Sequence, residues 1–311
     1  MNYVGIDIGG TFIKAGLVDE NGGIVKKSSV PTLATRKWER VMDDIVAQIN
    51  RLTAGAGYAA VGVGSPGAID SANGVVEYSP NLFWKDVPLA KYISGALGKT
   101  VKVGNDANVA ALGEAKFGAG RDYSDVVMLT LGTGVGSGIV AGGRLFEGYR
   151  SMGAEIGHMV IREDGEPCGC GRRGCLEAYA SATALVRDTL SAMQIAKNSL
   201  MWEECGNDLN KVDGRTSFAA AKRGDEAAKR VVAAYAKSLA EGIINIINIF
   251  RSQAIILGGG VCAQGDALLN PVREYVAKHR FGGSESLATD IITARLGGDA
   301  GVIGAACLVM E

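Results

Sequence analysis

The stretch that decides the fold is IDIGGT, residues Ile6–Thr11, because its glycines join two apolar runs through a tight turn. The runs on either side, Tyr3–Ile8 and Phe12–Val18, have the length and composition of β-strands. A third strand, Ile24–Val30, follows the glycine turn Asn21–Gly23. The start of the chain therefore predicts three consecutive strands joined by glycine turns.

A second strand–turn–strand unit, Val126–Val140, has the same layout. Its first run ends in LTLGTG, residues Leu129–Gly134, which resembles IDIGGT as an apolar strand that closes on a glycine turn. Few residues are identical between the two stretches, but their order of strand, turn and strand is the same. We therefore predict two related halves, each of which opens on a glycine-turn hairpin.

Helices and short strands alternate along the rest of the chain, which is typical of an α/β protein. In the predicted helix Glu226–Phe250, apolar residues recur every four positions and Asp225 is available as its N-cap. The other predicted elements are helices at Arg36–Leu52, Ala107–Phe117, around Val272–Val276 and at Ala300–Leu308, and strands at Ala59–Val63, Val101–Val103, Ala254–Leu257 and Ile291–Thr293.

The length of 311 residues predicts about two domains, at roughly 150 residues each. We place the main boundary near Gly118–Gly120. This gives a small N-terminal α/β domain of residues 1–118 plus the C-terminal helix 299–311, and a larger α/β domain of residues 119–298. The final helix is expected to pack back on the first domain.

The composition argues against several classes of partner. Lys plus Arg total 32 against 33 for Asp plus Glu, so the net charge of -1 offers no broad attraction to nucleic acid or to an anionic membrane. No apolar run approaches the roughly 20 residues of a membrane-spanning helix. Asp7 interrupts the first apolar run, so the N-terminus does not resemble a signal peptide. We expect a cytoplasmic protein.

Three glycine turns are candidates for phosphate binding, since closely spaced backbone N–H groups form concave nests for anions. They are Asp7–Thr11, Gly132–Gly136 and Gly258–Gly260. Asp7 can also hold Mg²⁺, and Lys14 can reach a phosphate group. An ordinary glycine-rich turn is the alternative reading of each motif taken alone. The third turn lacks the spacing of a P-loop or of a dinucleotide-binding fingerprint, which disfavours NAD.

Asn105-Asp106-x-Asn108 follows a short apolar strand and begins a predicted helix. A carboxylate at Asp106 can accept the proton of an attacking hydroxyl during phosphoryl transfer. The structural alternative is that Asp106 serves as the helix N-cap, a common position for Asp. The two roles can coexist.

His158, Cys168, Cys170 and Cys175 form the ligand set of a closed tetrahedral Zn²⁺ site. The glycines between the cysteines permit the sharp turns that converging sulfur atoms require. A disulfide is the alternative, but one residue between Cys168 and Cys170 is too few for an easy bridge and the third thiol is left over. We expect structural rather than catalytic zinc. The flanking Glu155 and Glu177 are either sugar ligands or solvated acids.

Together these residues resemble the ROK family, named for repressors, open reading frames and kinases, and most closely its bacterial glucokinases. The resemblance runs from Asp7 to Ala306, and its most specific part is Glu155-x-Gly157-His158 followed by the segment Cys168–Glu177. It implies an actin-like (ribonuclease H-like) ATPase fold with two domains around a central cleft, in which sugar and ATP bind. The family is commonly dimeric, so a homodimer is expected.

The resemblance also implies a role for each matching residue. Asp106 is the general base for the 6-hydroxyl of the sugar, and His158 binds zinc through one ring nitrogen and the sugar through the other. The implied sugar-binding set is Gly67, Asn81, Asn105, Asp106, Glu155, His158 and Glu177, and the implied ATP-binding set is Asp7, Gly9, Gly10, Thr11, Lys14, Gly132, Thr133, Gly134, Gly259 and Gly260.

Several alternatives stay open within this resemblance. Kinases for N-acetylglucosamine, N-acetylmannosamine, mannose, fructose or allose share most of these residues, because the orientation of one hydroxyl or an acetamido pocket decides the substrate. The sequence does not decide whether polyphosphate replaces ATP. A non-catalytic sugar sensor or a DNA-binding repressor is the alternative of a different class. Repressors of the family carry a helix-turn-helix before the kinase-like region, and Asp7 leaves no room for one in this sequence.

Overall fold

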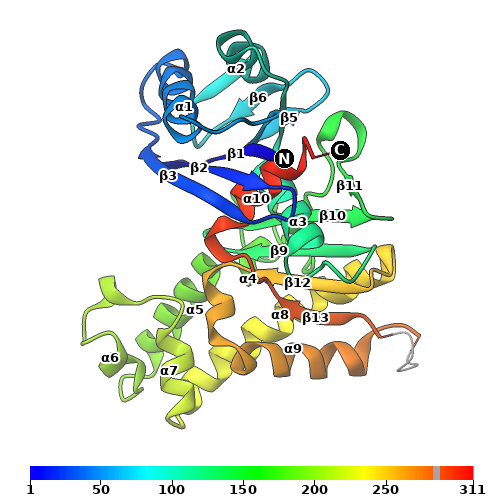
Figure 1. Ribbon diagram of the computed structural model, residues 1–311. Coiled ribbons are helices and arrows are strands. Elements are labelled where there is room, and N and C mark those ends of the chain that lie inside the picture. Colours follow the sequence, from blue (N-terminus) through cyan, green and yellow to red (C-terminus); the bar gives the residue numbers. More distant parts are fainter. Residues whose placement is uncertain (283–287, 311) are drawn as a thin grey trace. The chain divides into compact units, whose positions relative to one another are not determined.

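The computed structural model describes residues 1–282 and 288–310 as a mixed α/β protein (Figure 1). Residues 283–287 and 311, which the two predicted domains include, lie outside the described residues. The helices are α1 (Trp38–Leu52), α2 (Leu89–Leu97), α3 (Asp106–Phe117), α4 (Glu177–Ala180), α5 (Ala182–Ile195), α6 (Met201–Glu204), α7 (Thr216–Lys222), α8 (Glu226–Phe250), α9 (Asp266–His279) and α10 (Ala300–Cys307). None of the helices in the described part of the chain is long and apolar enough to cross a membrane.

The first sheet has the strand order β3-β2-β1-β4-β8. Its strands are β1 (Asn2–Ile8), β2 (Phe12–Asp19), β3 (Ile24–Pro31), β4 (Val61–Ser65) and β8 (Val101–Asn105). The three predicted N-terminal strands are therefore confirmed, as an antiparallel meander. β1, β4 and β8 pair in parallel, so their carboxyl ends lie at one edge of the sheet.

The second sheet has the order β11-β10-β9-β12-β13. Its strands are β9 (Val126–Leu131), β10 (Val135–Ala141), β11 (Arg144–Phe146), β12 (Ala254–Gly258) and β13 (Asp290–Thr293). Counted in chain order within each sheet, both sheets read third, second, first, fourth, fifth. The predicted relation between the two halves is therefore visible as the same strand order in both sheets.

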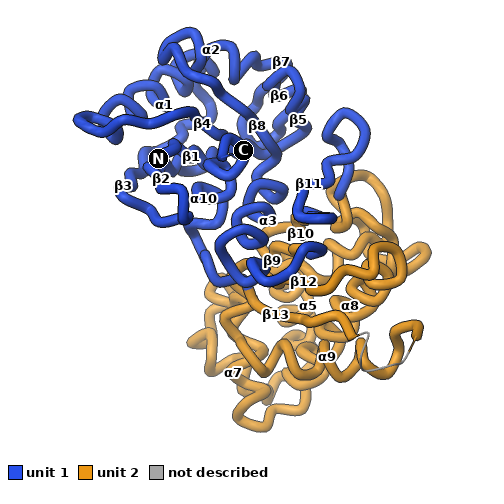
Figure 2. Tube along the Cα trace, turned by 45° about the vertical axis from the view of Figure 1, so that its right-hand side comes forward, with its two compact units in different colours: residues 1–126, 138–154, 294–311 blue, residues 127–137, 155–293 orange. Residues whose placement is uncertain are grey.

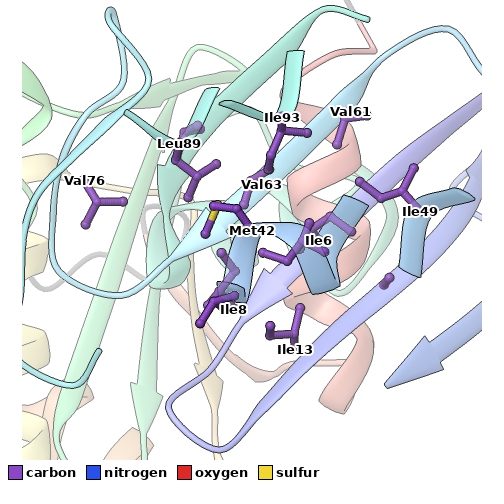
Figure 3. Close-up of a cluster of buried hydrophobic side chains, with 14 of the residues drawn as sticks. Ile6, Ile8, Ile13, Met42, Ile49, Val61, Val63, Val76, Leu89 and Ile93 are labelled. Atoms are coloured by element: carbon purple, nitrogen blue, oxygen red, sulfur yellow. The ribbon is translucent and has the colours of Figure 1, made fainter. Parts of the chain in front are cut away.

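The two faces of β1 differ in a way that positions the candidate site. Ile6 and Ile8 point into a core that α1 and α2 complete with residues such as Met42 and Ile93 (Figure 3). On the opposite face a Cβ added to Gly5 would lie 1.9 Å from the carbonyl oxygen of Val302 in α10. The final helix thus packs directly on the backbone of β1. Since side chains alternate along a strand, Asp7 faces α10 rather than the apolar core.

Several elements were missing from the sequence-based prediction. They include the third sheet, β5-β6-β7, whose strands are β5 (Ala68–Asp70), β6 (Val75–Ser79) and β7 (Trp84–Val87), and the helices α2, α5, α6 and α7. The strands of this sheet are three to five residues long, too short for alternation to be recognised. Two predicted boundaries also moved by two residues, since α1 begins at Trp38 and β4 begins at Val61.

The chain divides into two compact units (Figure 2). Unit 1 comprises residues 1–126, 138–154 and 294–311, and unit 2 comprises residues 127–137 and 155–293. The division differs from the predicted domain ranges mainly in residues 119–126 and 138–154. Gly138 explains part of this difference, because its Cα lies so close to α3 that an added Cβ would be 2.4 Å from the Cβ of Ala111.

Candidate active site

In unit 1, the turn after β1 presents Asp7 beside Lys14. Asp7 lies opposite Lys14 in the β1–β2 register, and their charged atoms are 3.9 Å apart. The turn itself is closed by the Gly9 N–H, which donates to the carbonyl of Phe12 at 2.9 Å. The Thr32 hydroxyl donates to the Gly9 carbonyl at 2.6 Å. Gly10 and Thr11 are exposed at the tip.

The segment that leads into α10 forms a wall beside Asp7. The Lys14 ammonium donates to the carbonyl of Gly298 at 3.0 Å. A Cβ added to Gly301 would lie 2.6 Å from the Asp7 carboxyl carbon, so a side chain there would displace the carboxylate. Burial raises the pKa of Asp7, the Lys14 ammonium lowers it, and the Asp106 carboxylate raises it. Asp7 and Asp106 are therefore close enough to interact electrostatically.

Asp106 is the first residue of α3, directly after β8. The helix N-cap is Asn105 rather than Asp106, because the Asn105 side chain accepts from the backbone N–H groups of Ala107 and Asn108 at 3.0 and 3.2 Å. The alternative reading of Asp106 as the N-cap is therefore wrong. Its carboxylate accepts a 2.8 Å hydrogen bond from the Ala107 N–H.

The Asp106 carboxyl is largely enclosed by protein, although part of the residue keeps some exposed surface. Burial raises its pKa above the ordinary value for Asp, and the hydrogen bond from the Ala107 N–H lowers it in part. Desolvation of this kind makes a carboxylate a stronger base. Perturbed carboxyl groups of this kind cluster at catalytic sites.

Gly67 and Asn81 complete the group in unit 1. The Asn105 amide donates to the Gly67 carbonyl at 3.2 Å. Gly67 has a φ of 108° and lies so close to β6 that an added Cβ would be 2.2 Å from the carbonyl of Tyr78. Asn81 is exposed in the turn after β6, and its carbonyl is 3.9 Å from a Cβ added to Gly10. The third sheet thus carries Asn81 to the phosphate turn.

In unit 2, the turn Gly132–Gly134 is fixed by the segment that begins at Glu177. The N–H of Ala182 donates to the Gly132 carbonyl at 2.8 Å. The hydroxyl of Thr183 donates to the carbonyl of Thr133, also at 2.8 Å. Because both bonds use the carbonyl oxygens, they leave the N–H groups of Thr133 and Gly134 for other partners.

Gly259 and Gly260 lie beside this turn. Gly259 has a φ of 93°, and an added Cβ would lie 2.3 Å from the carbonyl oxygen of Leu131, the last residue of β9. Both the backbone conformation and the space therefore require glycine at this position. Gly260 is exposed, with open space where a Cβ would stand. Two of the predicted phosphate turns are thus neighbours in unit 2.

The ligand atoms of His158, Cys168, Cys170 and Cys175 all lie within 4.8 Å of one another. The Cys168 sulfur is 3.5 Å from His158 Nδ1, and the sulfurs of Cys170 and Cys175 are 3.7 Å apart. No disulfide links them, since all three cysteines are free. One imidazole and three thiols at this spacing fit a tetrahedral metal ion such as Zn²⁺.

The thiols of this cluster differ in acidity. Burial raises the pKa of Cys168 to about 12 and also raises the pKa of Cys175. The backbone N–H of Arg172 lowers the pKa of Cys170. A metal ion must displace protons from the less acidic thiols, so metal affinity falls as the pH falls.

Glu177 joins this cluster to the phosphate turn. Its Oε1 accepts from the Cys168 thiol at 3.5 Å and lies 4.0 Å from His158 Nδ1. Its Oε2 accepts from the Val135 N–H at 3.0 Å, and a Cβ added to Gly134 would be 2.3 Å from the same oxygen. Glu155, by contrast, is exposed directly before the short 3₁₀ turn Ile156–His158.

The predicted site residues therefore form one group in each unit. Unit 1 carries the two aspartates, and unit 2 carries two glutamates, the thiols, the imidazole and two of the glycine turns. The unit 1 group is Asp7, Gly9, Gly10, Thr11, Lys14, Gly67, Asn81, Asn105 and Asp106; the unit 2 group is Gly132, Thr133, Gly134, Glu155, His158, Cys168, Cys170, Cys175, Glu177, Gly259 and Gly260.

The sequence-based prediction missed the residues that support these groups. Gly298 and Gly301 contact Lys14 and Asp7 from the far end of the chain, and Ala182 and Thr183 hold the turn of unit 2. The available signal for the first pair was the glycine pair Gly297–Gly298 directly before a helix of small residues. A backbone donor such as Ala182 leaves no signal in the side-chain pattern.

Comparison with known proteins assigns the whole chain to one family. The sequence pattern of the ROK family matches residues 3–311. The glucokinase of Thermotoga maritima is 39% identical, over 100% of this chain and 98% of that protein. The crystal structure of a ROK family glucokinase from Streptomyces griseus in complex with glucose and AMPPNP superposes with a TM-score of 0.83, at 36% identity and 99% coverage of both chains.

Two further matches show the breadth of the similarity. The ROK hexokinase of Thermus thermophilus superposes with a TM-score of 0.82, at 35% identity over 98% of this chain and 97% of that chain. The xylose repressor of Bacillus subtilis is 28% identical over 99% of this chain but over 77% of its own length. By sequence identity, the repressor is thus a more distant relative of this chain than the hexokinase is.

Proposed function

The chain belongs to the ROK family, and we propose that it is an ATP-dependent glucokinase that phosphorylates the 6-hydroxyl of glucose. Its fold is the actin-like ATPase fold of the ROK kinases. The observation that carries the proposal is Asp106, an enclosed carboxylate of raised pKa in a chain that matches glucokinases over its full length.

Asp106 is the general base of the proposed reaction. Its carboxylate takes the proton from the sugar 6-hydroxyl while the hydroxyl oxygen attacks the γ-phosphorus of ATP and the bond to the ADP oxygen breaks. Asn105 supports the base by fixing the start of α3 with two hydrogen bonds. Because burial raises the pKa of Asp106, its carboxylate holds the transferred proton better than an exposed Asp does.

Asp7, Lys14 and the turn Gly9–Thr11 form the proposed phosphate side of unit 1. The Asp7 side chain is 21% exposed, so its oxygens can take a hydrated Mg²⁺ ion that enters with ATP. Mg²⁺ bound there supplies charge neutralisation on the phosphate oxygens. Lys14 contributes a positive charge, and the turns of unit 2 contribute backbone N–H groups.

The proposed sugar ligands are Asn81, Asn105 and Gly67 in unit 1 and Glu155, His158 and Glu177 in unit 2. His158 Nδ1 faces the thiol of Cys168, so we assign Nδ1 to the metal and Nε2 to a sugar hydroxyl. Zn²⁺ in a closed site of four ligands has a structural role. His158, Cys168, Cys170 and Cys175 would hold it and thereby fix the orientation of the imidazole toward the sugar.

An assay of ADP release with Mg-ATP tests the proposal against glucose, mannose, fructose, allose, N-acetylglucosamine and N-acetylmannosamine. A preference for glucose in kcat/KM is expected. A preference for another sugar would contradict the assignment of glucose as the substrate, but the protein would still be a sugar kinase. A parallel assay of glucose 6-phosphate formation with polyphosphate in place of ATP tests the donor. Binding to DNA without turnover of any sugar would instead favour the repressor class.

A homodimer in the cytoplasm completes the proposal. Both expectations rest on the resemblance to the family, and the balanced charge of the chain is compatible with them. The mass of the protein in solution, measured by light scattering, tests the dimer: about twice 32.2 kDa is expected, and a monomer would contradict it.

A further inference from the structure

Glu114 is a fully buried carboxylate in α3, with 0% of its surface exposed. Its two oxygens accept four hydrogen bonds from three backbone N–H groups, of which the Arg295 N–H is shared between both oxygens. Oε1 accepts from Arg295 at 2.9 Å and from Leu296 at 2.7 Å, and Oε2 accepts from Arg295 at 3.1 Å and from Ala119 at 2.8 Å. A charge is costly to bury unless it is paired or hydrogen-bonded, and these four bonds provide that compensation.

The bonds hold a segment that touches the candidate site. Two residues after Leu296, the carbonyl of Gly298 accepts the hydrogen bond from Lys14 at 3.0 Å. The next residue, Asp299, pairs with Lys27 at 3.0 Å. Gly301 then lies directly against the Asp7 carboxylate. Glu114 therefore fixes the start of segment Arg295–Asp299, which contacts Lys14 through Gly298, although Glu114 itself touches neither Lys14 nor Asp7.

The body of α10 does not depend on Glu114 for its place. Gly113 and Gly304 let α3 and α10 approach backbone to backbone, since a Cβ added to Gly304 would be 1.6 Å from the carbonyl of Val109. Glu114 acts one step earlier in the chain, on the residues that precede the helix. Gly118 leaves room for the Glu114 carboxylate, because a Cβ at that position would be 2.0 Å from Glu114 Oε2.

We propose that Glu114 is a positioning residue for the nucleotide side of the site, which holds segment Arg295–Asp299 so that the carbonyl of Gly298 sets the place of Lys14. The inference rests on the proposed function, in which Asp7 and Lys14 face Mg²⁺ and the phosphates of ATP. It assigns Glu114 a role in ATP binding and none in direct contact with sugar.

Glu114→Gln tests this role with little change in volume. An amide presents an NH₂ group where a carboxylate oxygen accepted, so at least one backbone N–H loses its partner. We expect the KM for Mg-ATP to rise about tenfold, while the dissociation constant of glucose, measured by calorimetry without nucleotide, changes less than about twofold. An equal change in both constants, or in neither, would overturn the proposal.

Ile93→Ala is the matched control for a loss of stability alone. Ile93 is a residue of α2 that is fully buried in the core of unit 1, and its truncation lowers the melting temperature through a cavity. The KM for Mg-ATP should stay unchanged in this variant. If Glu114→Gln lowers the melting temperature as the control does but leaves this KM unchanged, Glu114 is only structural.

A double-variant cycle tests whether Glu114 affects the KM for Mg-ATP through the contact between Gly298 and Lys14. In a Lys14→Met background, Glu114→Gln should raise the KM for Mg-ATP by much less than about tenfold, because the two changes act on one contact. Full additivity would contradict the path through Gly298. If Glu114→Gln fails to fold, Gly118→Ala is the substitute, because its Cβ displaces the same carboxylate without removing the charge. The KM for Mg-ATP should again rise while the dissociation constant of glucose stays nearly unchanged.

Asp7→Asn separates failure of this inference from failure of the proposed function. If Asp7→Asn impairs use of Mg-ATP and Glu114→Gln does not, the positioning role is wrong and the phosphate side of the site is upheld. If neither variant affects Mg-ATP, the proposed assignment of Asp7 fails as well.

Discussion

The two five-stranded sheets share one strand order but end in different chemistry. The first strand of one sheet ends in Asp7-Ile8 and is followed by Gly9, and the first strand of the other ends in Thr130-Leu131 and is followed by Gly132. Both strands then enter a glycine turn. With these glycines aligned, the carboxylate of Asp7 corresponds to the hydroxyl of Thr130. The repeated scaffold thus provides a backbone turn twice and a carboxylate once.

The difference suggests how the work is divided between the units. A glycine turn offers neutral N–H donors, which bind phosphate without demanding a particular side chain. A carboxylate is needed only where a proton or a cation must be held, and unit 1 has two, at Asp7 and Asp106. In unit 2 the corresponding region is bonded through Glu177 to a cluster of three thiols and an imidazole.

The largest effect is expected at Asp106. Asp106→Ala removes the proposed general base, whose help is typically worth about 10²–10⁴ in rate, so kcat should fall by that factor while glucose still binds. Asp106→Asn should behave similarly, because an amide of the same size cannot take the proton. Steady-state ADP release measures both. Rates within a few-fold of the parent protein would remove Asp106 from the mechanism.

A paired substitution sharpens the comparison between the two strands. Asp7→Asn should lower kcat/KM for Mg-ATP by roughly 10²-fold, the size expected on loss of one electrostatic stabiliser. Thr130→Val, at the corresponding place in the other sheet, should change it by less than about threefold. Steady-state kinetics across a range of Mg²⁺ concentrations measures both variants. Equal losses would mean that the two strands share one role.

Much of the fold could be predicted because local sequence patterns indicate many of its strands and helices. The apolar runs around the glycine turns predicted β1, β2 and β9, and the four-residue spacing after Asp225 predicted α8 together with its N-cap. The small β5-β6-β7 sheet was not predicted, because its short strands depend on pairing with one another and show little sequence pattern of their own.

The candidate site was predictable where side chains carry the chemistry. The four candidate metal ligands stand close together in the sequence, and the structure brings their atoms together. The supporting contacts were not predictable, because they pair residues far apart in the chain through backbone atoms. The bond from Lys14 to the Gly298 carbonyl spans 284 residues, and no residue type marks a carbonyl as a partner.

Removal of the metal is expected to have an effect of intermediate size, mainly on the affinity for the sugar. Cys170→Ser should lower zinc content, measured by atomic emission, and weaken glucose binding by about 10–100-fold, the range typical for lost support of a metal site. The wild-type protein should also release zinc on acidification, since the thiols take up protons. Cys205→Ser is the control, because Cys205 lies outside the cluster. Unchanged zinc content in Cys170→Ser would contradict the site.

The smallest effect concerns stability, and its sign follows from the direction of the pKa shift. Burial raises the pKa of Asp106 in the folded protein, so the folded state binds more protons than the unfolded state between the unfolded and folded pKa values. The free energy of unfolding therefore falls as the pH rises through this window, and the cost of the buried charge is fully present above it. Asp106→Asn removes that charge and should stabilise the protein at neutral pH, with a smaller gain in acid.

Asp70 provides the control of opposite sign within the same unit. The side-chain hydrogen bond from Asn73, aided by the Asn73 backbone N–H, lowers the pKa of the Asp70 carboxyl. This contribution to stability is present above the unfolded pKa and is lost as the pH falls through the folded pKa. Asp70→Asn should therefore destabilise slightly at neutral pH, where Asp106→Asn stabilises. Urea unfolding of both variants at several pH values measures the difference. If Asp106→Asn destabilises at neutral pH, the Asp106 carboxylate contributes net stability to the fold, and the activity of this site does not come at the expense of stability.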